Sequence, residues 1–187
     1  MLLSGSHTIE EFQRWASYLI NVEVVHISYL KETEARQLIE RPVKDFALRY
    51  KPNAVERVLD LTRSHPYLVQ LLCAEIVALK NEQYPSRRRL ATSYDVEEAV
   101  SQALSRGSLF FADIERNQVS KTGLDILRFM ANRGKGMITS REVLSHQFRN
   151  NLDNTLNSLL QHELIEQVGN GYRFQVELIR RWFDRQN

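Results

Sequence analysis

Four consecutive residues, Arg63-Ser64-His65-Pro66, place side chains suited to ligand binding just before an apolar helical run. A proline in the first helical position loses no hydrogen bond there, and its φ angle already suits a helix. Ser64 can cap that helix, and Arg63 can complement a helix dipole or contact a phosphate group. His65 has no second histidine, cysteine or carboxylate at metal-ligand spacing, so the sequence predicts no metal site.

Elsewhere the sequence shows no arrangement of residues typical of catalysis. No Ser/His/Asp, Cys/His or paired-carboxylate pattern stands out, and Asp95, Glu97 and Glu98 are expected at a helix start, where the helix dipole favours their charge. The run Arg87-Arg88-Arg89 indicates a solvated loop, with contact to phosphates or to an acidic partner as the alternative. We therefore predict no catalytic residues in this chain.

The composition excludes several classes of protein. The chain has 187 residues, of which 43% are hydrophobic and 26% charged, as in ordinary globular proteins. A net charge of +2 indicates no strong attraction to nucleic acid or to a membrane surface. The single cysteine, Cys73, excludes an internal disulfide and fits a reducing compartment. No apolar run approaches the ~20 residues of a membrane span. We expect a cytoplasmic protein with no membrane partner.

The string from Leu61 to Leu72, LTRSHPYLVQLL, resembles the Gly-x-Pro lid motif of the signal-transduction ATPases with numerous domains (STAND), a branch of the AAA+-like NTPases. Ser64 stands where that family usually has glycine. The resemblance implies that Pro66 lies against a bound adenine, with Ser64 and His65 beside it, and that Arg63 is a sensor-type arginine near the γ-phosphate.

None of the seven glycines belongs to a G-x-x-x-x-G-K-[ST] phosphate loop. ATP and Mg²⁺ would accordingly be held by the intact parent ATPase, and this chain alone is expected to bind no cofactor and to catalyse nothing. Phosphoryl transfer needs the backbone amides and lysine of such a loop and a carboxylate for Mg²⁺.

Residues 1–30 predict the end of a parallel α/β sheet, with strands at 1–4 and 22–29 around a short helix that Thr8 caps. The resemblance implies that this segment is the end of the NTPase α/β core. By resemblance, Ser4, Gly5 and Ser6 occupy the sensor-1 region. The strand that would lie between these two strands is missing, which leaves apolar edges unpaired. We expect a homodimer through these edges, ahead of pairing between the two strands or packing against the helices that follow.

Helical periodicity then predicts four helices within residues 31–106, at 32–39, 52–62, 66–80 and 94–105. Their number and order resemble the AAA+ lid. Residues 107–118 predict a connector outside regular helices, in which Leu109, Phe110 and Phe111 are buried between two units.

Residues 119–187 predict three helices, at 121–132, 140–148 and 152–162, followed by two strands around Gly169-Asn170-Gly171. This order, with the ending YRFQVELIRRWF, resembles the winged helix that follows STAND lids. The predicted fold class is therefore mainly α, comprising the remnant of a P-loop NTPase α/β sheet, a four-helix AAA+-type lid and a winged-helix domain.

A winged helix can place its third helix in the major groove of DNA. Here that helix contains no lysine or arginine, although most DNA affinity comes from phosphate neutralisation. DNA contact is therefore disfavoured relative to a protein partner, and it would depend on surrounding arginines: Arg141, Arg149, Arg173, Arg180 and Arg181.

The favoured interpretation is a lid and winged helix that couple nucleotide state to a protein partner or to the remaining ATPase core. Two alternatives stay open. One is a winged-helix DNA-binding regulator. The other is half of a split ATPase that another chain completes, which a phosphate loop in the neighbouring upstream reading frame would indicate.

Overall fold

The computed structural model describes residues 29–149 and 151–185. The strands expected at 1–4 and 22–29 fall almost wholly outside this part of the chain, as do Ser4, Gly5 and Ser6 and the proposed dimer edge. The described chain is mainly α-helical, with two small sheets. No helix in it is long and apolar enough to cross a membrane.

The first group of helices, here called the N-terminal group, has the bounds α2 Glu32–Glu40, α3 Pro52–Thr62, α4 Pro66–Glu82 and α5 Ser93–Arg106. Pro52 and Pro66 occupy the first helical position of α3 and α4, as the sequence predicted for Pro66. Thr92 and Asp95 form a capping box at the start of α5. The apolar faces of these helices share one core, with Leu68, Leu72 and Ile76 of α4 fully buried.

A two-stranded parallel sheet, which the sequence pattern did not predict, joins the loops at one end of the N-terminal group. Strand β1 (Arg49–Tyr50) lies beside β2 (Leu90–Ala91), with Arg49 opposite Leu90 and Tyr50 opposite Ala91. Strands of two residues carry too little alternation of polar and apolar residues to be recognised in a sequence.

Residues 107–118 are helical, which corrects the prediction of an irregular connector. Helix α6 (Ser108–Asp113) continues directly from α5 and runs into a π-helical turn, η1 (Ile114–Gln118). Leu109 is 86% exposed, so the prediction that it is buried was wrong, because it lies on the outer face of this helix. Phe111 is fully buried, as predicted, and Phe110 is partly buried.

The second group, here called the C-terminal group, contains four helices and a small sheet. The bounds are α7 Lys121–Ala131, β3 Thr139–Ser140, α8 Arg141–Gln147, α9 Leu152–Gln161, β4 Ile165–Val168, β5 Gly171–Phe174 and α10 Glu177–Asp184. The predicted hairpin is present as β4 and β5, and β3 adds a third strand in the order β3-β5-β4. A Cβ atom on Gly171 would lie 2.8 Å from the carbonyl oxygen of Thr139, so glycine permits this close pairing.

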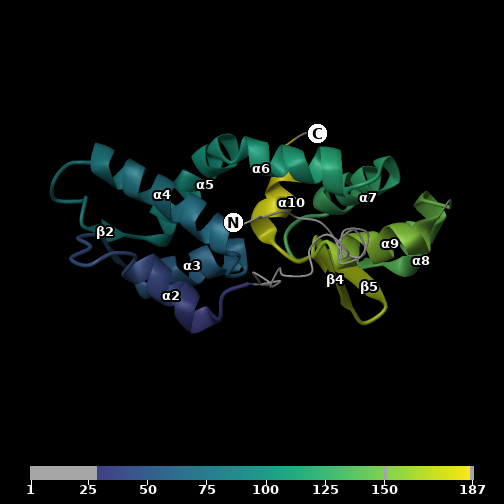
Figure 1. Ribbon diagram of the computed structural model, residues 1–187, viewed down its shortest axis with the longest axis horizontal. Helices are drawn as coiled ribbons and strands as arrows, with labels where there is room; N and C mark the ends of the chain where they lie inside the picture. Colours follow the sequence, from purple (N-terminus) through teal and green to yellow (C-terminus); the bar gives the residue numbers. More distant parts are fainter. Residues whose placement is uncertain (1–28, 150, 186–187) are drawn as a thin grey trace, which may run out of the picture.

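The two groups lie side by side along the long axis of the molecule, and helix α10 of the C-terminal group faces the N-terminal group (Figure 1). It packs on α7 of its own group and also contacts α3 and α5 of the N-terminal group. The contact region formed by α3, α5, α6 and α10 is called the joint below.

Candidate functional site

The turn between α3 and α4 has an unusual backbone. Arg63 and Ser64 both have positive φ angles, of 51° and 61°, in the left-handed region that favours glycine. Ser64 forms no side-chain cap on α4, because His65 occupies the capping position without a side-chain hydrogen bond. The carbonyl oxygen of Ser64 instead accepts a hydrogen bond from the amide of Leu30, at 3.0 Å. The turn is thus fixed to the segment that enters from the N-terminal side.

His65 and Pro66 follow this turn, and His65 is packed among aromatic rings. Its ring lies edge-on to Tyr29, at 5.4 Å between centroids, and to Phe110, at 5.7 Å. Burial lowers the pKa of His65 below its ordinary value and favours a neutral imidazole. Burial is also the main reason that the pKa of Tyr29 is raised to about 12.

The ring contacts continue from His65 into the joint. Phe110 lies 5.3 Å from Phe111, and Phe111 stacks on Trp182 of α10 at 4.9 Å with only 14° between the ring planes. Five rings therefore connect the start of the described chain, the α3–α4 turn and the C-terminal group: Tyr29, His65, Phe110, Phe111 and Trp182.

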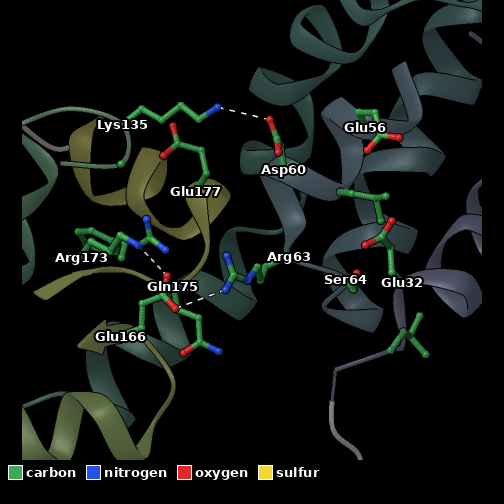
Figure 2. A pocket seen from close by; sticks show the side chains of 14 residues that line it. Glu32, Glu56, Asp60, Arg63, Ser64, Lys135, Glu166, Arg173, Gln175 and Glu177 are labelled. Carbon is green, nitrogen blue, oxygen red and sulfur yellow. Dashed lines mark hydrogen bonds and ion pairs between the residues drawn. The ribbon is translucent and has the colours of Figure 1, made fainter. Parts of the chain in front are cut away.

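A cleft of about 550 Å³ opens on the other side of the turn, between the N-terminal and C-terminal groups (Figure 2). Arg63 and Ser64 line it, whereas His65 and Pro66 do not. The remaining lining comes from α2, α3, the α7–β3 turn, the hairpin and the start of α10: Leu30, Glu32, Glu56, Leu59, Asp60, Lys135, Gly136, Glu166, Arg173, Phe174, Gln175 and Glu177.

Ion pairs cross this cleft and link the two groups. A terminal nitrogen of Arg63 lies 3.4 Å from Oε2 of Glu166, and Oε1 of the same carboxylate accepts from Nε of Arg173 at 2.7 Å (Figure 2). Lys135 lies 3.5 Å from the carboxylate of Asp60. The Arg63 side chain is 54% exposed, so it can exchange Glu166 for another anion at modest cost.

The cationic side chains that line the cleft are paired with carboxylates that also line it. Within residues 29–149 and 151–185, no group of three or more histidine, cysteine, aspartate or glutamate side chains is arranged to hold a metal ion. The cations that line the cleft are held by carboxylates of the same chain. An entering anion would therefore have to displace Glu166 from Arg63.

Four of the five arginines proposed for DNA contact are engaged by the protein itself. Arg180 is 7% exposed and donates to Glu177, Asp184 and the carbonyl oxygen of Ala131. The remaining three make ion pairs, Arg181 with Glu97 and Glu177, Arg173 with Glu166, and Arg141 with Asp153. Arg149, in the loop between α8 and α9, is exposed and makes no ion pair with another described residue. Of the five arginines, Arg149 is thus the one that the described chain leaves without an ion-pair partner.

Several residues of this region were not singled out from the sequence. Glu166 and Trp182 lie more than 100 residues from Arg63 along the chain, so only the packing of the two groups brings them near the turn. Glu97, which the sequence indicated only as part of a helix start, receives hydrogen bonds from Arg57 of α3 and Arg181 of α10. No local pattern marks such pairings.

The sequence matches no protein-family model, and a search of curated proteins gives no significant match.

Proposed function

We propose that this chain is the lid and winged-helix portion of a STAND-class, AAA+-like ATPase, and that it couples nucleotide state to interaction with a partner protein. In this proposal helices α2–α5 are the lid, and the C-terminal group is the winged helix, with β4 and β5 as its wing. The nucleotide and Mg²⁺ would be held mainly by the remaining ATPase core.

The observation that best supports the proposal is the positive φ angle of Ser64. The resemblance gives this position a glycine, and a positive φ angle is the physical reason for a glycine in such a turn. Ser64 has a φ angle of 61° and stands two residues before a proline in the first helical position. A glycine would adopt this φ angle without strain, which supports the interpretation of the turn as a variant of the Gly-x-Pro motif.

The row of five rings supports a coupling role. A nucleotide base packed on Pro66 would press on the turn, and His65 would transfer that displacement through Phe110 and Phe111 to Trp182 of α10. Packed rings transmit displacement when they have two alternative arrangements, because close-packed side chains do not deform continuously. The cleft ion pair between Arg63 and Glu166 would break in the same movement.

The chain supplies only some of the groups that would hold a nucleotide. Arg63 is exposed enough to meet a phosphate group from the cleft, whereas Pro66 is half-buried and does not line the cleft. No phosphate loop is present in the sequence, so we expect the isolated chain to hydrolyse no ATP and to bind nucleotide weakly at best.

The first test searches the coding sequence upstream of Met1 for a phosphate loop. The proposal expects a G-x-x-x-x-G-K-[ST] loop there, in the same reading frame or in a neighbouring one. Absence of such a loop from both frames would overturn the proposal.

The second test measures ADP binding by calorimetry on the chain together with that core. We expect Pro66→Ala to weaken ADP binding about tenfold or more. Pro52→Ala is the matched control, because Pro52 begins α3 in the same helical position and lies outside the turn and the cleft. Equal affinities for the two variants would contradict a role of Pro66 in nucleotide binding.

A further inference from the structure

The strand pair β1–β2 and its loops form a strongly basic surface at the end of the N-terminal group far from the joint. Residues 41–51 and 83–91, here called the basic edge, contain a single carboxylate, that of Asp45, and seven cations: Arg41, Lys44, Arg49, Lys51, Arg87, Arg88 and Arg89. All seven side chains are exposed. Because the whole chain has a net charge of only +2, positive charge is concentrated here.

These cations are not used for internal ion pairs. Among residues 29–149 and 151–185, none of the seven lies within ion-pair distance of a carboxylate. Arg88 is held only through Nε, which donates to the carbonyl oxygen of Gln83 at 2.5 Å. Within the part of the chain that the structure describes, this surface therefore lacks a counter-charge and is open to solvent ions or to a bound partner.

Strand pairing brings the cations of the two loops together. The amide of Arg49 donates to the carbonyl oxygen of Arg89, and that of Lys51 donates to Ala91. Side chains alternate along a strand, so Arg49 and Lys51 share the outer face while Tyr50 is buried between them. Figure 1 shows the two loops together at one end of the molecule.

A buried polar network fixes the base of this surface. Nζ of Lys80 lies 3.0 Å from Oδ1 of Asp95 and 2.7 Å from Oε1 of Gln83, and Gln83 donates to Asp95 at 3.1 Å. Lys80 and Asp95 are only 4% and 5% exposed. The loop that carries Arg87–Arg89 therefore begins from a fixed point at Gln83.

Two aromatic side chains are exposed beside the same network. Tyr84 follows Gln83 and is 82% exposed, and Tyr94 precedes Asp95 and is 74% exposed. Exposed rings next to unpaired arginines match the chemistry of single-stranded nucleic acid, whose bases stack on aromatic rings while its phosphates bind cations. An acidic protein segment would use the cations but would gain less from the two exposed phenol rings.

We propose that the basic edge binds single-stranded nucleic acid, through phosphate contacts to Arg87, Arg88 and Arg89 and base stacking on Tyr84 and Tyr94. The surface favours a single strand over a duplex, because a short loop and strands of two residues offer no helix or long hairpin to enter a groove. This site is distinct from α9 and does not depend on nucleotide binding at the α3–α4 turn.

The test measures fluorescence anisotropy of labelled 12-nucleotide dT and rU strands and of a 12-base-pair duplex, titrated with the full chain at several salt concentrations. We expect both single strands to bind more tightly than the duplex, with binding that weakens as salt rises. Replacing the three arginines (R87Q/R88Q/R89Q) should weaken binding at least about tenfold, and it should reduce the slope of log K against log salt by about 2, at ~0.7 per lost phosphate contact.

The matched control removes three exposed cations elsewhere, R116Q/K121Q/R185Q, which changes the net charge equally. It should weaken binding less than about twofold. Equal losses for the two triple variants would show that net charge alone causes binding and would overturn the proposal, as would failure of both single strands to bind at 50 mM salt.

A tyrosine variant separates nucleic acid from an acidic protein partner. Y84L/Y94L keeps apolar volume but removes the rings, and we expect it to weaken strand binding at least about fivefold. Unchanged strand affinity, or displacement of the strand by an equal concentration of polyglutamate, would overturn base stacking and assign the surface to acidic proteins. Circular dichroism of each variant confirms that the fold is retained.

Discussion

The joint and the basic edge use positive charge in opposite ways. At the joint, Arg181 of α10 donates to Glu97 of α5 at 2.8 Å and to Glu177 at 3.2 Å, and Arg57 of α3 contacts the same Glu97. At the basic edge, the exposed arginines of the Arg87–Arg89 run have no carboxylate partner among the described residues. The cations of the joint hold the two groups of helices together, whereas the cations of the basic edge remain available to a partner.

This difference distinguishes charged residues that stabilise the fold from charged residues that can bind a partner. An arginine paired across elements contributes to the free energy of unfolding, so its replacement should change stability. An unpaired, exposed arginine contributes little to stability, and its replacement should change only binding. The predictions below test that distinction, beginning with the largest expected effect.

Loss of the buried ring of the joint should have the largest effect. We expect Phe111→Ala to lower the free energy of unfolding by about 4 kcal/mol, because it leaves a cavity beside the stacked Trp182. Leu109→Ala, two residues away and 86% exposed, should change it by less than ~0.5 kcal/mol. Urea unfolding measures both. Equal effects would mean that the joint is not packed around Phe111.

The buried carboxylate below the basic edge should come next, and its effect depends on pH. Burial raises the pKa of Asp95, but hydrogen bonds from Thr92, Lys80 and Gln83 outweigh burial and lower it from 3.8 to about 2. This contribution to stability is present above pH 3.8 and is lost as the pH falls toward 2. We expect Asp95→Asn to cost about 3 kcal/mol at neutral pH, because it leaves the buried Lys80 without a negatively charged partner.

Acid titration of the melting temperature checks this interpretation of Asp95. Below about pH 2 the wild-type chain and the Asp95→Asn variant should converge, because both lack the carboxylate. Glu98→Gln on the exposed face of the same helix is the control and should change little. A constant difference between wild type and Asp95→Asn down to pH 2 would contradict the assignment.

The cross-group ion pairs should have a smaller effect that salt removes. We expect Arg181→Gln to cost about 1 kcal/mol at low salt and clearly less at 1 M salt, because Arg181 and Glu97 are 24% and 40% exposed and are therefore screened. A double-mutant cycle with Glu97→Gln measures the coupling energy. A coupling energy of zero at low salt would contradict the claim that paired cations stabilise the joint, unlike those of the basic edge.

The smallest expected effect concerns His65. Its pKa in the folded chain lies below the ordinary value of 6.5 because of burial, so the unfolded chain binds more protons near that pH. The contribution of neutral His65 is complete above pH 6.5 and is lost as the pH falls through its lower folded pKa. His65→Phe should therefore flatten the dependence of melting temperature on pH between 7 and 5, and an unchanged dependence in this variant would contradict the role of His65.

Local sequence patterns predicted the helices well. Helix α3 has the predicted bounds, and α4, α5, α7 and α9 differ from prediction by two residues or fewer at either end, because prolines and capping residues mark where they begin. The hairpin β4–β5 was predicted from its glycine turn. The predictions failed at α6, because the apolar triplet Leu109-Phe110-Phe111 shows no helical periodicity. They also failed at the short strands β1, β2 and β3.

The site was predicted less completely, because it depends on contacts between distant residues. The sequence identified Arg63, Ser64, His65 and Pro66 but gave no sign that Arg63 would meet Glu166 across a cleft. It could not separate paired from unpaired arginines, since pairing depends on which helices pack together. Arg180, proposed for DNA contact, is accordingly buried against Glu177 and Asp184, whereas Arg87–Arg89, expected to be a solvated loop, became the stronger candidate for nucleic acid.

The stack of Phe111 on Trp182 also gives the chain an intrinsic optical reporter. The sequence has two tryptophans, and Trp15→Phe would leave Trp182 as the single indole fluorophore. The indole Nε1 is buried without a hydrogen-bond partner in the described chain, so emission should be at short wavelength while the joint is closed. Separation of α10 from α6 would hydrate the ring and shift its emission to longer wavelength. Opening of the joint can thus be followed in real time without attaching a dye.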